Sequence, residues 1–255
     1  MIEILLNGCN GAMGTAISQY VNKRDDADII AGIDKTCEMH FHYPVYESIT
    51  DFHGNADVII DFSNPSAFDS VIDFAVSKGI PAVIATTGLS DVQHEKIKAA
   101  AKRIPVFSSA NMSLGINLLC ALAKKAEQIL GADFDIEIVE AHHHNKIDAP
   151  SGTALMLYNS LCEESDEKMH AVYDRHSYRQ KREKNEIGIL SIRGGTIVGE
   201  HEVIFAGEDE VITLSHSARS KTVFALGAVN AAEFLIGKEP GIYDMNDLIN
   251  ENTAG

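Results

Sequence analysis

Short apolar segments alternate with segments of helical spacing along the first 113 residues. The apolar runs have the length and composition of buried strands, and they lie at 2–7, 27–34, 56–63, 81–88 and 104–113. Segments whose apolar residues recur every three or four positions lie between them, at 15–22, 65–79 and 91–103. Strands that alternate with helices build a parallel sheet covered by helices on both faces. The pattern therefore predicts a doubly wound N-terminal domain.

The pattern changes after residue 113. Residues 114–130 predict one long helix, residues 133–144 alternate as a half-exposed strand does, and residues 152–164 predict a second helix. A polar stretch at 165–186 precedes three consecutive strand-like segments joined by tight turns, at 187–195, 197–207 and 209–218. This arrangement predicts a mixed or antiparallel sheet, and therefore a second domain.

A helix predicted over 221–237 is apolar enough to pack against the first domain. The chain would then cross between the domains twice. We predict one domain from residues 1–113 with 222–255, and a smaller one from residues 114–221. The predicted fold class is α/β, with an N-terminal Rossmann-type parallel sheet and a smaller α+β domain that contains a mixed sheet.

Composition and charge narrow the range of partners. The chain has 255 residues, of which 45% are hydrophobic and 23% charged, as in ordinary globular proteins. Its formal net charge of -16 argues against nucleic acid or an anionic membrane as the main partner, because both favour a basic surface. The N-terminus lacks a basic signal-peptide region, and no apolar run reaches membrane-spanning length. We expect a small-molecule ligand, held by a local basic pocket if it is an anion.

The cysteines lie far apart in the sequence and form no CxxC pair; they are Cys9, Cys37, Cys120 and Cys162. Such spacing is typical of free thiols in a reducing compartment. We therefore predict a cytoplasmic protein.

A glycine-rich segment, "GCNGAMG", lies between the first predicted strand and the first predicted helix. Gly8, Gly11 and Gly14 form a variant of the dinucleotide-binding pattern, in which glycines let the backbone approach a pyrophosphate at a helix N-terminus. Asp34 ends the next predicted strand, twenty residues after Gly14, where a carboxylate accepts hydrogen bonds from ribose hydroxyls. Glycines are also common in ordinary turns, but the strand and helix on either side favour a nucleotide site. The segments "ATTG" and "SSANMS" follow later strands and are expected to line the same cleft.

The segment "EAHHHNKIDAPSGTA", residues 140–154, gathers several proton carriers ahead of a sharp turn. On a continuous strand His142 and His144 would share one face and His143 the other, so a zinc site would need a bend. No CxxC or HExxH pattern supports such a site, and we predict no bound metal. The remaining alternative is a solvated loop in which the histidines have no role.

The residues after these histidines weaken that alternative. Ser151 is a favoured N-cap for the next helix, and Gly152 and Thr153 would place backbone N–H groups at its N-terminus, which is an anion site. Lys146 lies a few residues before it, and histidine suits proton transfer near neutral pH. With a nicotinamide cofactor on the first domain, the segment would complete a site for a hydride acceptor.

These segments, with "SSANMSLGIN" and "IRGGTIVGEHEVIFAG", resemble the dihydrodipicolinate reductase family, also called 4-hydroxy-tetrahydrodipicolinate reductases. The resemblance spans essentially the whole chain. It implies an enzyme of lysine and diaminopimelate biosynthesis that reduces 4-hydroxy-tetrahydrodipicolinate, a small cyclic dicarboxylate, to tetrahydrodipicolinate with NADH or NADPH. It also implies homotetramers formed through the smaller domain.

The resemblance assigns roles by motif position. His142 matches the family's catalytic proton donor or acceptor, and Lys146 matches its second proton donor. The expected substrate contacts are His143, Gly152 and Thr153. The expected cofactor contacts are Gly8, Cys9, Asn10, Gly11, Ala12, Met13, Asp34, Lys35, Ala85, Thr86, Thr87, Ser109, Ala110, Asn111 and Met112.

The chain departs from the family pattern at two places. Many members carry arginine where this chain has Ala12, which removes one cationic contact to the cofactor phosphates. Members also often show arginine and then histidine where this chain has His144 and Asn145.

The adjacent Asp34 and Lys35 favour different cofactors, because the carboxylate repels the 2′-phosphate of NADPH and the lysine attracts it. We expect both cofactors to be used.

Two other functions share parts of this pattern. Another two-domain dehydrogenase of an amino-acid precursor would keep the glycine segment without the histidine, lysine and Pro-Ser-Gly-Thr run. A non-catalytic sensor of NAD(P)H would keep the glycine segment, lose the proton donors and carry a surface for a partner.

Overall fold

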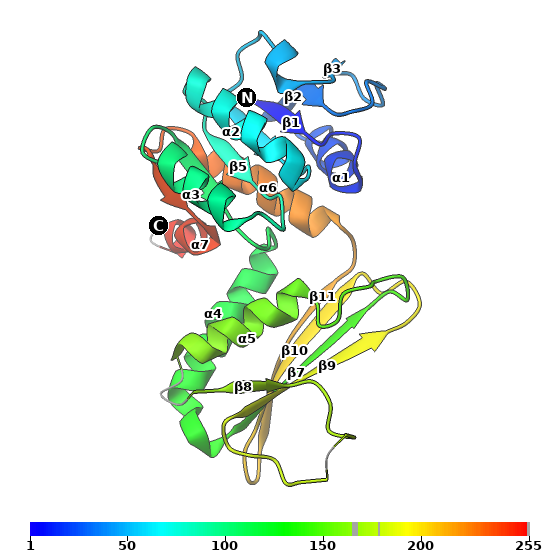
Figure 1. Ribbon diagram of the computed structural model, residues 1–255, viewed down its shortest axis with the longest axis vertical. Coiled ribbons are helices and arrows are strands. Elements are labelled where there is room, and N and C mark those ends of the chain that lie inside the picture. Colours follow the sequence, from blue (N-terminus) through cyan, green and yellow to red (C-terminus); the bar gives the residue numbers. More distant parts are fainter. Residues whose placement is uncertain (165–167, 178, 254–255) are drawn as a thin grey trace. The chain divides into compact units, whose positions relative to one another are not determined.

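The structure is a computed structural model that describes residues 1–164, 168–177 and 179–253. The chain forms two compact units (Figure 1). Unit 1 comprises Met1–Leu114 and Lys221–Gly255, and unit 2 comprises Gly115–Ser220. Parts of the polar stretch predicted at 165–186 lie outside the described residues.

A seven-stranded sheet forms the centre of unit 1, and all its strand pairs are parallel. The strands are β1 (Ile2–Asn7), β2 (Ala27–Ile33), β3 (Val45–Tyr46), β4 (Val58–Asp61), β5 (Ala82–Ile84), β6 (Pro105–Ser108) and β12 (Gly241–Tyr243). Their order is β12-β6-β5-β4-β1-β2-β3. The run β3-β2-β1-β4-β5-β6 is the strand order of the Rossmann fold, in which ligands bind at the carboxyl ends of the strands near β1 and β4. The predicted fold class is confirmed for this unit.

Helices cover both faces of this sheet because successive strand residues point to opposite sides. The helices of unit 1 are α1 (Ala12–Val21), α2 (Pro65–Lys78), α3 (Asp91–Ala100), α6 (Thr222–Leu235) and α7 (Met245–Thr253), with a 3₁₀ turn at Ile49–Asp51. Ile4 and Leu6 belong to the core beneath α1 and α6, whereas Leu5 belongs to the core beneath α2 and α3. The helix predicted over 221–237 therefore packs on the first sheet, as expected.

Unit 2 contains a mixed five-stranded sheet with the order β11-β10-β7-β9-β8. Its elements are α4 (Leu114–Leu130, which starts at the end of unit 1), a 3₁₀ turn (Gly131–Asp133), β7 (Asp135–His142), α5 (Gly152–Glu164), β8 (His170–Val172), β9 (Glu186–Arg193), β10 (Gly199–Ala206) and β11 (Val211–Ala218). Buried side chains of α4 and α5 pack on one face of the sheet. The mixed sheet is confirmed. The three consecutive strands do not pair in order, because β7 lies between β9 and β10.

None of the helices within the described ranges is long and apolar enough to cross a membrane.

Candidate functional site

The glycine segment of unit 1 turns too tightly for side chains at Gly8 and Gly14. Gly8 has a φ of +79°, and a Cβ atom there would lie 2.6 Å from the backbone oxygen of Phe62. A Cβ atom on Gly14 would lie 2.5 Å from the carbonyl oxygen of Cys9. Both distances are shorter than real contacts of a Cβ atom allow. The glycines are therefore needed to bring β1, the loop and α1 together.

The N-terminus of α1 directly follows the glycine segment. The helix begins at Ala12, three residues before the predicted start, and Gly11 is an N-cap without a capping side chain. Its first turn contains no acidic residue, so the amides and the helix dipole favour an anion there. Ala12 is exposed and Met13 is half-buried. Because Ala12 is small and exposed, it leaves space at the helix end but supplies no positive charge.

Asn10 ties this loop to the segment that follows β2. Its backbone N–H donates to Asp34 Oδ2 at 3.1 Å, and its side-chain amide donates to the carbonyl oxygens of Thr36 and Glu38 at 2.8 and 3.1 Å. Asp34 Oδ1 accepts from the backbone N–H of Thr36 at 3.3 Å. The Asp34 carboxylate is therefore held in place at the carboxyl end of β2, beside the exposed Lys35.

Eight of the fifteen predicted cofactor residues line two cavities in unit 1. A cavity of about 360 Å³ is lined by Gly8, Gly11, Asp34 and Lys35, together with Asn7, Ile33, Glu47, Ser48, Ile49, Phe62, Ser63, Asn64, Ser66, Ala67 and Ser70. A smaller cavity, of about 210 Å³, is lined by Thr86, Thr87, Ser109 and Ala110, together with Ile84, Gly88, Leu89, His94 and Ser108. Both cavities lie where parallel strands end, as the fold predicts.

Four of the predicted cofactor residues are buried in unit 1. Cys9, Ala85, Thr86 and Met112 are at most 8% exposed. Burial raises the pKa of the Cys9 thiol to about 12, and the nearby Asp34 adds to the effect. The side chains of these residues are therefore largely inaccessible from solvent. Asn111 is partly exposed, and its backbone oxygen accepts from Ser109 Oγ at 2.9 Å.

Sequence reasoning missed Asp61, a fully buried carboxylate at the end of β4. It accepts from Asn7 Nδ2 at 2.7 Å, from Ser63 Oγ at 2.6 Å and from Thr86 Oγ1 at 2.8 Å. These donors lie at or just after the ends of β1, β4 and β5 and line the two cavities, so Asp61 connects three cavity-lining segments. An aspartate that ends an apolar strand, in "VIIDFS", was the available signal.

In unit 2, β7 ends at His142, and the next residues leave the strand. Gly194 N–H donates to the His142 carbonyl at 2.9 Å, and His144 N–H donates to the Gly195 carbonyl at 3.2 Å. The strand alternation expected for His143 and His144 therefore does not apply. His142 is 9% exposed, His143 is half-buried and His144 is exposed. Of these three histidines, only His142 lies on the buried face of the sheet.

His142 contacts a buried carboxylate that sequence reasoning did not single out. Its Nδ1 lies 2.6 Å from Oε2 of Glu140, a residue with no exposed surface. Arg193 donates to both carboxylate oxygens, at 2.7 and 2.8 Å, and the Ser151 backbone N–H donates at 3.2 Å. Burial opposes ionisation of Glu140, but hydrogen bonds from Arg193, Ser191 and His142 outweigh it and lower its pKa to about 2.

Ser151 caps α5, as predicted, and joins it to the sheet. Its Oγ accepts from Ala154 N–H at 3.1 Å and lies 3.0 Å from Nε2 of His201. His201 is 3% exposed, and burial lowers its pKa to about 4, with a smaller contribution from His142. An imidazole with this pKa is neutral at pH 7, so His201 adds no positive charge beside His142.

The start of α5 is accessible. Gly152 is exposed, and a Cβ atom there would meet nothing within 4 Å. Thr153 follows it in the first turn of the helix and is half-buried. Lys146 Nζ pairs with Asp148 Oδ1 at 2.9 Å, and the Asp148 carbonyl accepts from Arg193 at 2.7 Å. The lysine is therefore tethered to the same loop that Arg193 fixes to the sheet.

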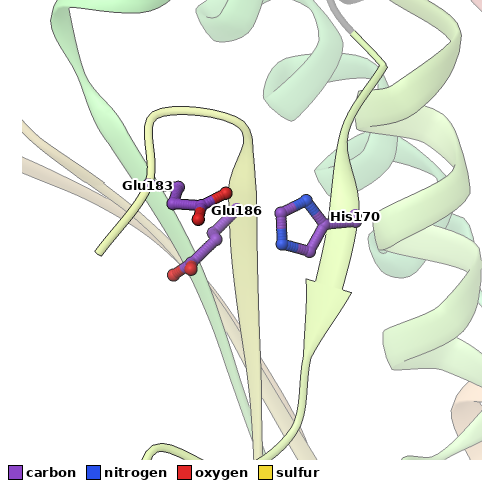
Figure 2. A group of neighbouring side chains, drawn as sticks. All are labelled: His170, Glu183 and Glu186. Carbon is purple, nitrogen blue, oxygen red and sulfur yellow. The ribbon is translucent and has the colours of Figure 1, made fainter. Parts of the chain in front are cut away.

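A separate cluster in unit 2 has the residue types of a metal site. Ligand atoms of His170, Glu183 and Glu186 lie within 4.8 Å of one another, and Figure 2 shows the imidazole of His170 facing the two carboxylates. Arg175 pairs with Glu186 at 2.7 Å. This guanidinium offsets the negative charge that would attract a cation, so the cluster is explained as an ion-pair group at the start of β9.

Comparison with known proteins assigns both halves of the chain to one family. Residues 2–112 match the profile described as dihydrodipicolinate reductase, N-terminus, and residues 115–249 match the profile described as dihydrodipicolinate reductase, C-terminus. The chain belongs to the dihydrodipicolinate reductase family. The resemblance stated from the sequence is thereby confirmed.

Relatives within this family cover nearly the whole chain. The 4-hydroxy-tetrahydrodipicolinate reductases of Caldanaerobacter subterraneus subsp. tengcongensis and Clostridium novyi are each 49% identical over 249 residues, which is 98% of either chain. A solved structure of dipicolinate-bound dihydrodipicolinate reductase from Paenisporosarcina sp. TG-14 matches with a TM-score of 0.80 and 22% identity. The match covers 96% of this chain and 99% of the Paenisporosarcina chain. At 22% identity it shows only that the two chains share a fold.

Proposed function

We propose that this protein reduces 4-hydroxy-tetrahydrodipicolinate to tetrahydrodipicolinate with a nicotinamide cofactor, in lysine and diaminopimelate biosynthesis. The observation that carries the proposal is the match of both halves of the chain to the two reductase profiles. The enzymes that are 49% identical over 98% of the chain carry the same activity in their names. The groups described in the two units supply the chemistry that this reaction needs.

The residues of unit 1 fit a dinucleotide. A backbone turn that excludes side chains leads into the start of α1, which suits a pyrophosphate. The Asp34 carboxylate is held where it accepts from a ribose hydroxyl, and the adjoining cavity is about 360 Å³. A bound reduced nicotinamide would supply the hydride. We propose that the fifteen residues assigned by motif position form this site, with Cys9, Ala85 and Met112 acting through their backbone.

The residues of unit 2 fit a dicarboxylate that must be protonated as it is reduced. The accessible start of α5, at Gly152 and Thr153, offers a carboxylate a helix N-terminus, and His143 lies on the preceding loop. We propose that Lys146 and His142 act together as general acids that supply the proton and polarise the substrate. The ion pair of Lys146 with Asp148 would then open so that the ammonium group can face the substrate.

We propose that both NADH and NADPH serve as reductants. The Asp34 carboxylate already accepts from Asn10 and Thr36, which spreads its charge. Lys35 is exposed and lines the same cavity, where it can approach a 2′-phosphate as a flexible point charge. A lysine lacks the rigid fork of arginine, so the resulting preference for NADPH is expected to be weak.

We extend the proposal to a cytoplasmic homotetramer that assembles through unit 2. Leu190 and Ile192 are 46% and 52% exposed. They alternate along β9 with Ile189, which belongs to the core under α4 and α5, so they lie on the opposite face of the sheet. An exposed apolar sheet face favours association. Sedimentation should give a tetramer for the parent and smaller species for Leu190→Glu combined with Ile192→Glu.

The proposed reaction is tested by mixing the pure protein with NADH or NADPH and freshly prepared 4-hydroxy-tetrahydrodipicolinate. We expect a loss of the cofactor's absorbance that requires both enzyme and substrate. Turnover of another amino-acid precursor instead would identify a different two-domain dehydrogenase. Cofactor binding without turnover of any of these substrates would identify a sensor. Either result would contradict the proposed activity.

A further inference from the structure

The hydrogen bond between His142 and Glu140 fixes which ring nitrogen carries a hydrogen. The Glu140 carboxylate is ionised, and an ionised carboxylate only accepts hydrogen bonds. Because Oε2 lies 2.6 Å from Nδ1 of His142, Nδ1 must be the donor. The imidazole therefore carries a hydrogen on Nδ1 whether it is neutral or protonated, and only its Nε2 gains and loses a proton.

The carboxylate that imposes this state is buried and held by several hydrogen bonds. Glu140 has no exposed surface, and Arg193 clamps both of its oxygens at 2.7 and 2.8 Å. The backbone N–H of Ser151 adds a further donor to Oε1 at 3.2 Å. The arginine also balances the carboxylate's charge, so the buried anion does not depend on a permanently charged His142.

The Nε2 atom of the His142 ring is accessible. Nε2 of His142 makes no hydrogen bond within the described ranges, and it is not among the buried polar atoms that lack a partner, so solvent reaches it. A Cβ atom on Gly199 would lie 3.1 Å from this nitrogen. The ring of His201 meets the His142 ring edge-on, with centroids 5.2 Å apart. The ring is thus held by its neighbours, while glycine at position 199 leaves Nε2 accessible.

We propose that Glu140 is a positioning residue that keeps a hydrogen on Nδ1 of His142, so that Nε2 alone exchanges a proton with the substrate. The inference rests on the proposed reductase function. In the forward reaction the imidazolium gives its Nε2 proton to the reduced substrate and becomes the neutral Nδ1–H form. Solvent then returns a proton to Nε2, and the hydrogen bond to Glu140 persists throughout.

Replacing Glu140 with glutamine gives a specific expectation. The amide has one oxygen and one NH₂ group, and the NH₂ group must take one of the two carboxylate oxygen positions. At Oε1 it would face two fixed donors, from Arg193 and Ser151, whereas at Oε2 it would face one, from Arg193. The Oε2 position is therefore favoured, and there the NH₂ group donates to Nδ1. We expect Glu140→Gln to convert neutral His142 to the Nε2–H form.

The experiment measures the tautomer of His142 in the full-length protein by two-bond proton–nitrogen correlation spectra of histidine-labelled samples. The pH is raised until the ring nitrogens report the neutral form, and His142→Gln assigns the signals. We expect the Nδ1–H form in the parent and the Nε2–H form in Glu140→Gln. We also expect kcat of Glu140→Gln to fall by at least about tenfold, with KM for the cofactor unchanged, because general acid catalysis is worth about 10²–10⁴-fold.

Glu186→Gln is the matched control. Glu186 is also a sheet glutamate, 2% exposed and paired with an arginine, but that arginine is Arg175 and not the Arg193 that holds Glu140. We expect this variant to keep the tautomer and kcat of the parent. A fall in kcat without a tautomer change in Glu140→Gln, or an Nε2–H form in the parent, overturns the inference. The tautomer is measured without substrate, so failure of the proposed function shows separately, as a parent protein that does not turn over 4-hydroxy-tetrahydrodipicolinate.

Discussion

The glycine segment of unit 1 and the histidine segment of unit 2 use opposite physical means to prepare a site. The glycine segment is built from backbone, and at Gly8 and Gly14 an added Cβ atom would collide with carbonyl oxygens. The histidine segment is built from side chains, in which Glu140 and Arg193 hold His142, while Gly152 faces open space. The fold of the glycine segment is therefore disrupted by adding atoms at Gly8 or Gly14, and the position of His142 by removing or exchanging polar groups.

The largest expected effect is on the side-chain region. Lys146→Ala should lower kcat by about 10²–10⁴-fold, because it removes a proposed general acid. Lys146→Arg keeps the positive charge but cannot release its proton, so it should also lose turnover. Steady-state kinetics decide between proton donation and simple charge attraction. Parental activity in the arginine variant would show that only charge matters at this position.

The backbone region should respond to a single methyl group. Gly14→Ala places a Cβ atom 2.5 Å from the Cys9 carbonyl oxygen, so we expect a loss of about 1–3 kcal/mol in the free energy of unfolding of unit 1. Gly152→Ala, with nothing within 4 Å, should leave the free energy of unfolding nearly unchanged. Denaturant titrations of the two variants make the comparison. Equal losses in both would contradict the assignment of the two glycines to different roles.

The side-chain region should also make unit 2 sensitive to acid. The folded-state pKa of His201 is lowered to about 4 from an ordinary value of 6.5, so its stabilising effect is complete above pH 6.5 and is lost as the pH falls toward 4. The slope for one proton is at most about 1.4 kcal/mol per pH unit. His201→Gln keeps a polar group but does not titrate, and it should flatten the curve of unfolding free energy between pH 6.5 and 4. An unchanged curve would mean that other groups cause the acid sensitivity.

The smallest expected effect concerns the choice of cofactor. The kcat/KM values for NADH and NADPH should agree within about tenfold, or about 1.4 kcal/mol. Lys35→Ala should lower kcat/KM for NADPH and leave kcat/KM for NADH unchanged. Asp34→Ala should lower kcat/KM for NADH and leave that for NADPH unchanged. Kinetics with each cofactor test this. A parental preference above about a hundredfold, or equal losses for both cofactors in Lys35→Ala, would exclude the proposed balance of charges.

Much of the fold could be predicted because its long elements have strong periodicity. The helices at 114–130 and 152–164 occur as predicted, and β1 matches its predicted range. The strands β3, β8 and β12 were missed, because two or three residues are too few to show a period of two. The α7 helix was also missed. Its weakly apolar sequence, "MNDLINENT", gives little signal without the neighbours it packs on.

The candidate site could be predicted where it depends on local sequence. Ser151 as a helix cap follows from its position in the chain. The contact of Arg193 with Glu140 joins residues 53 positions apart, and no local pattern indicates it. The placement of β7 between β9 and β10 creates this contact and also brings His201 beside His142. Such pairings depend on strand order, which hydrophobic periodicity does not specify.

The division of roles between the two regions is tested most directly by titrating the full-length protein with NADH in the absence of substrate. The account predicts that Lys146→Ala and Gly152→Val bind NADH with the parental Kd, while Gly14→Ala and Asp34→Ala bind it more weakly. Gly152→Val should at the same time lose inhibition by pyridine dicarboxylates. A higher Kd for NADH in Lys146→Ala than in the parent would contradict the account. A parental Kd in both Gly14→Ala and Asp34→Ala would also contradict it.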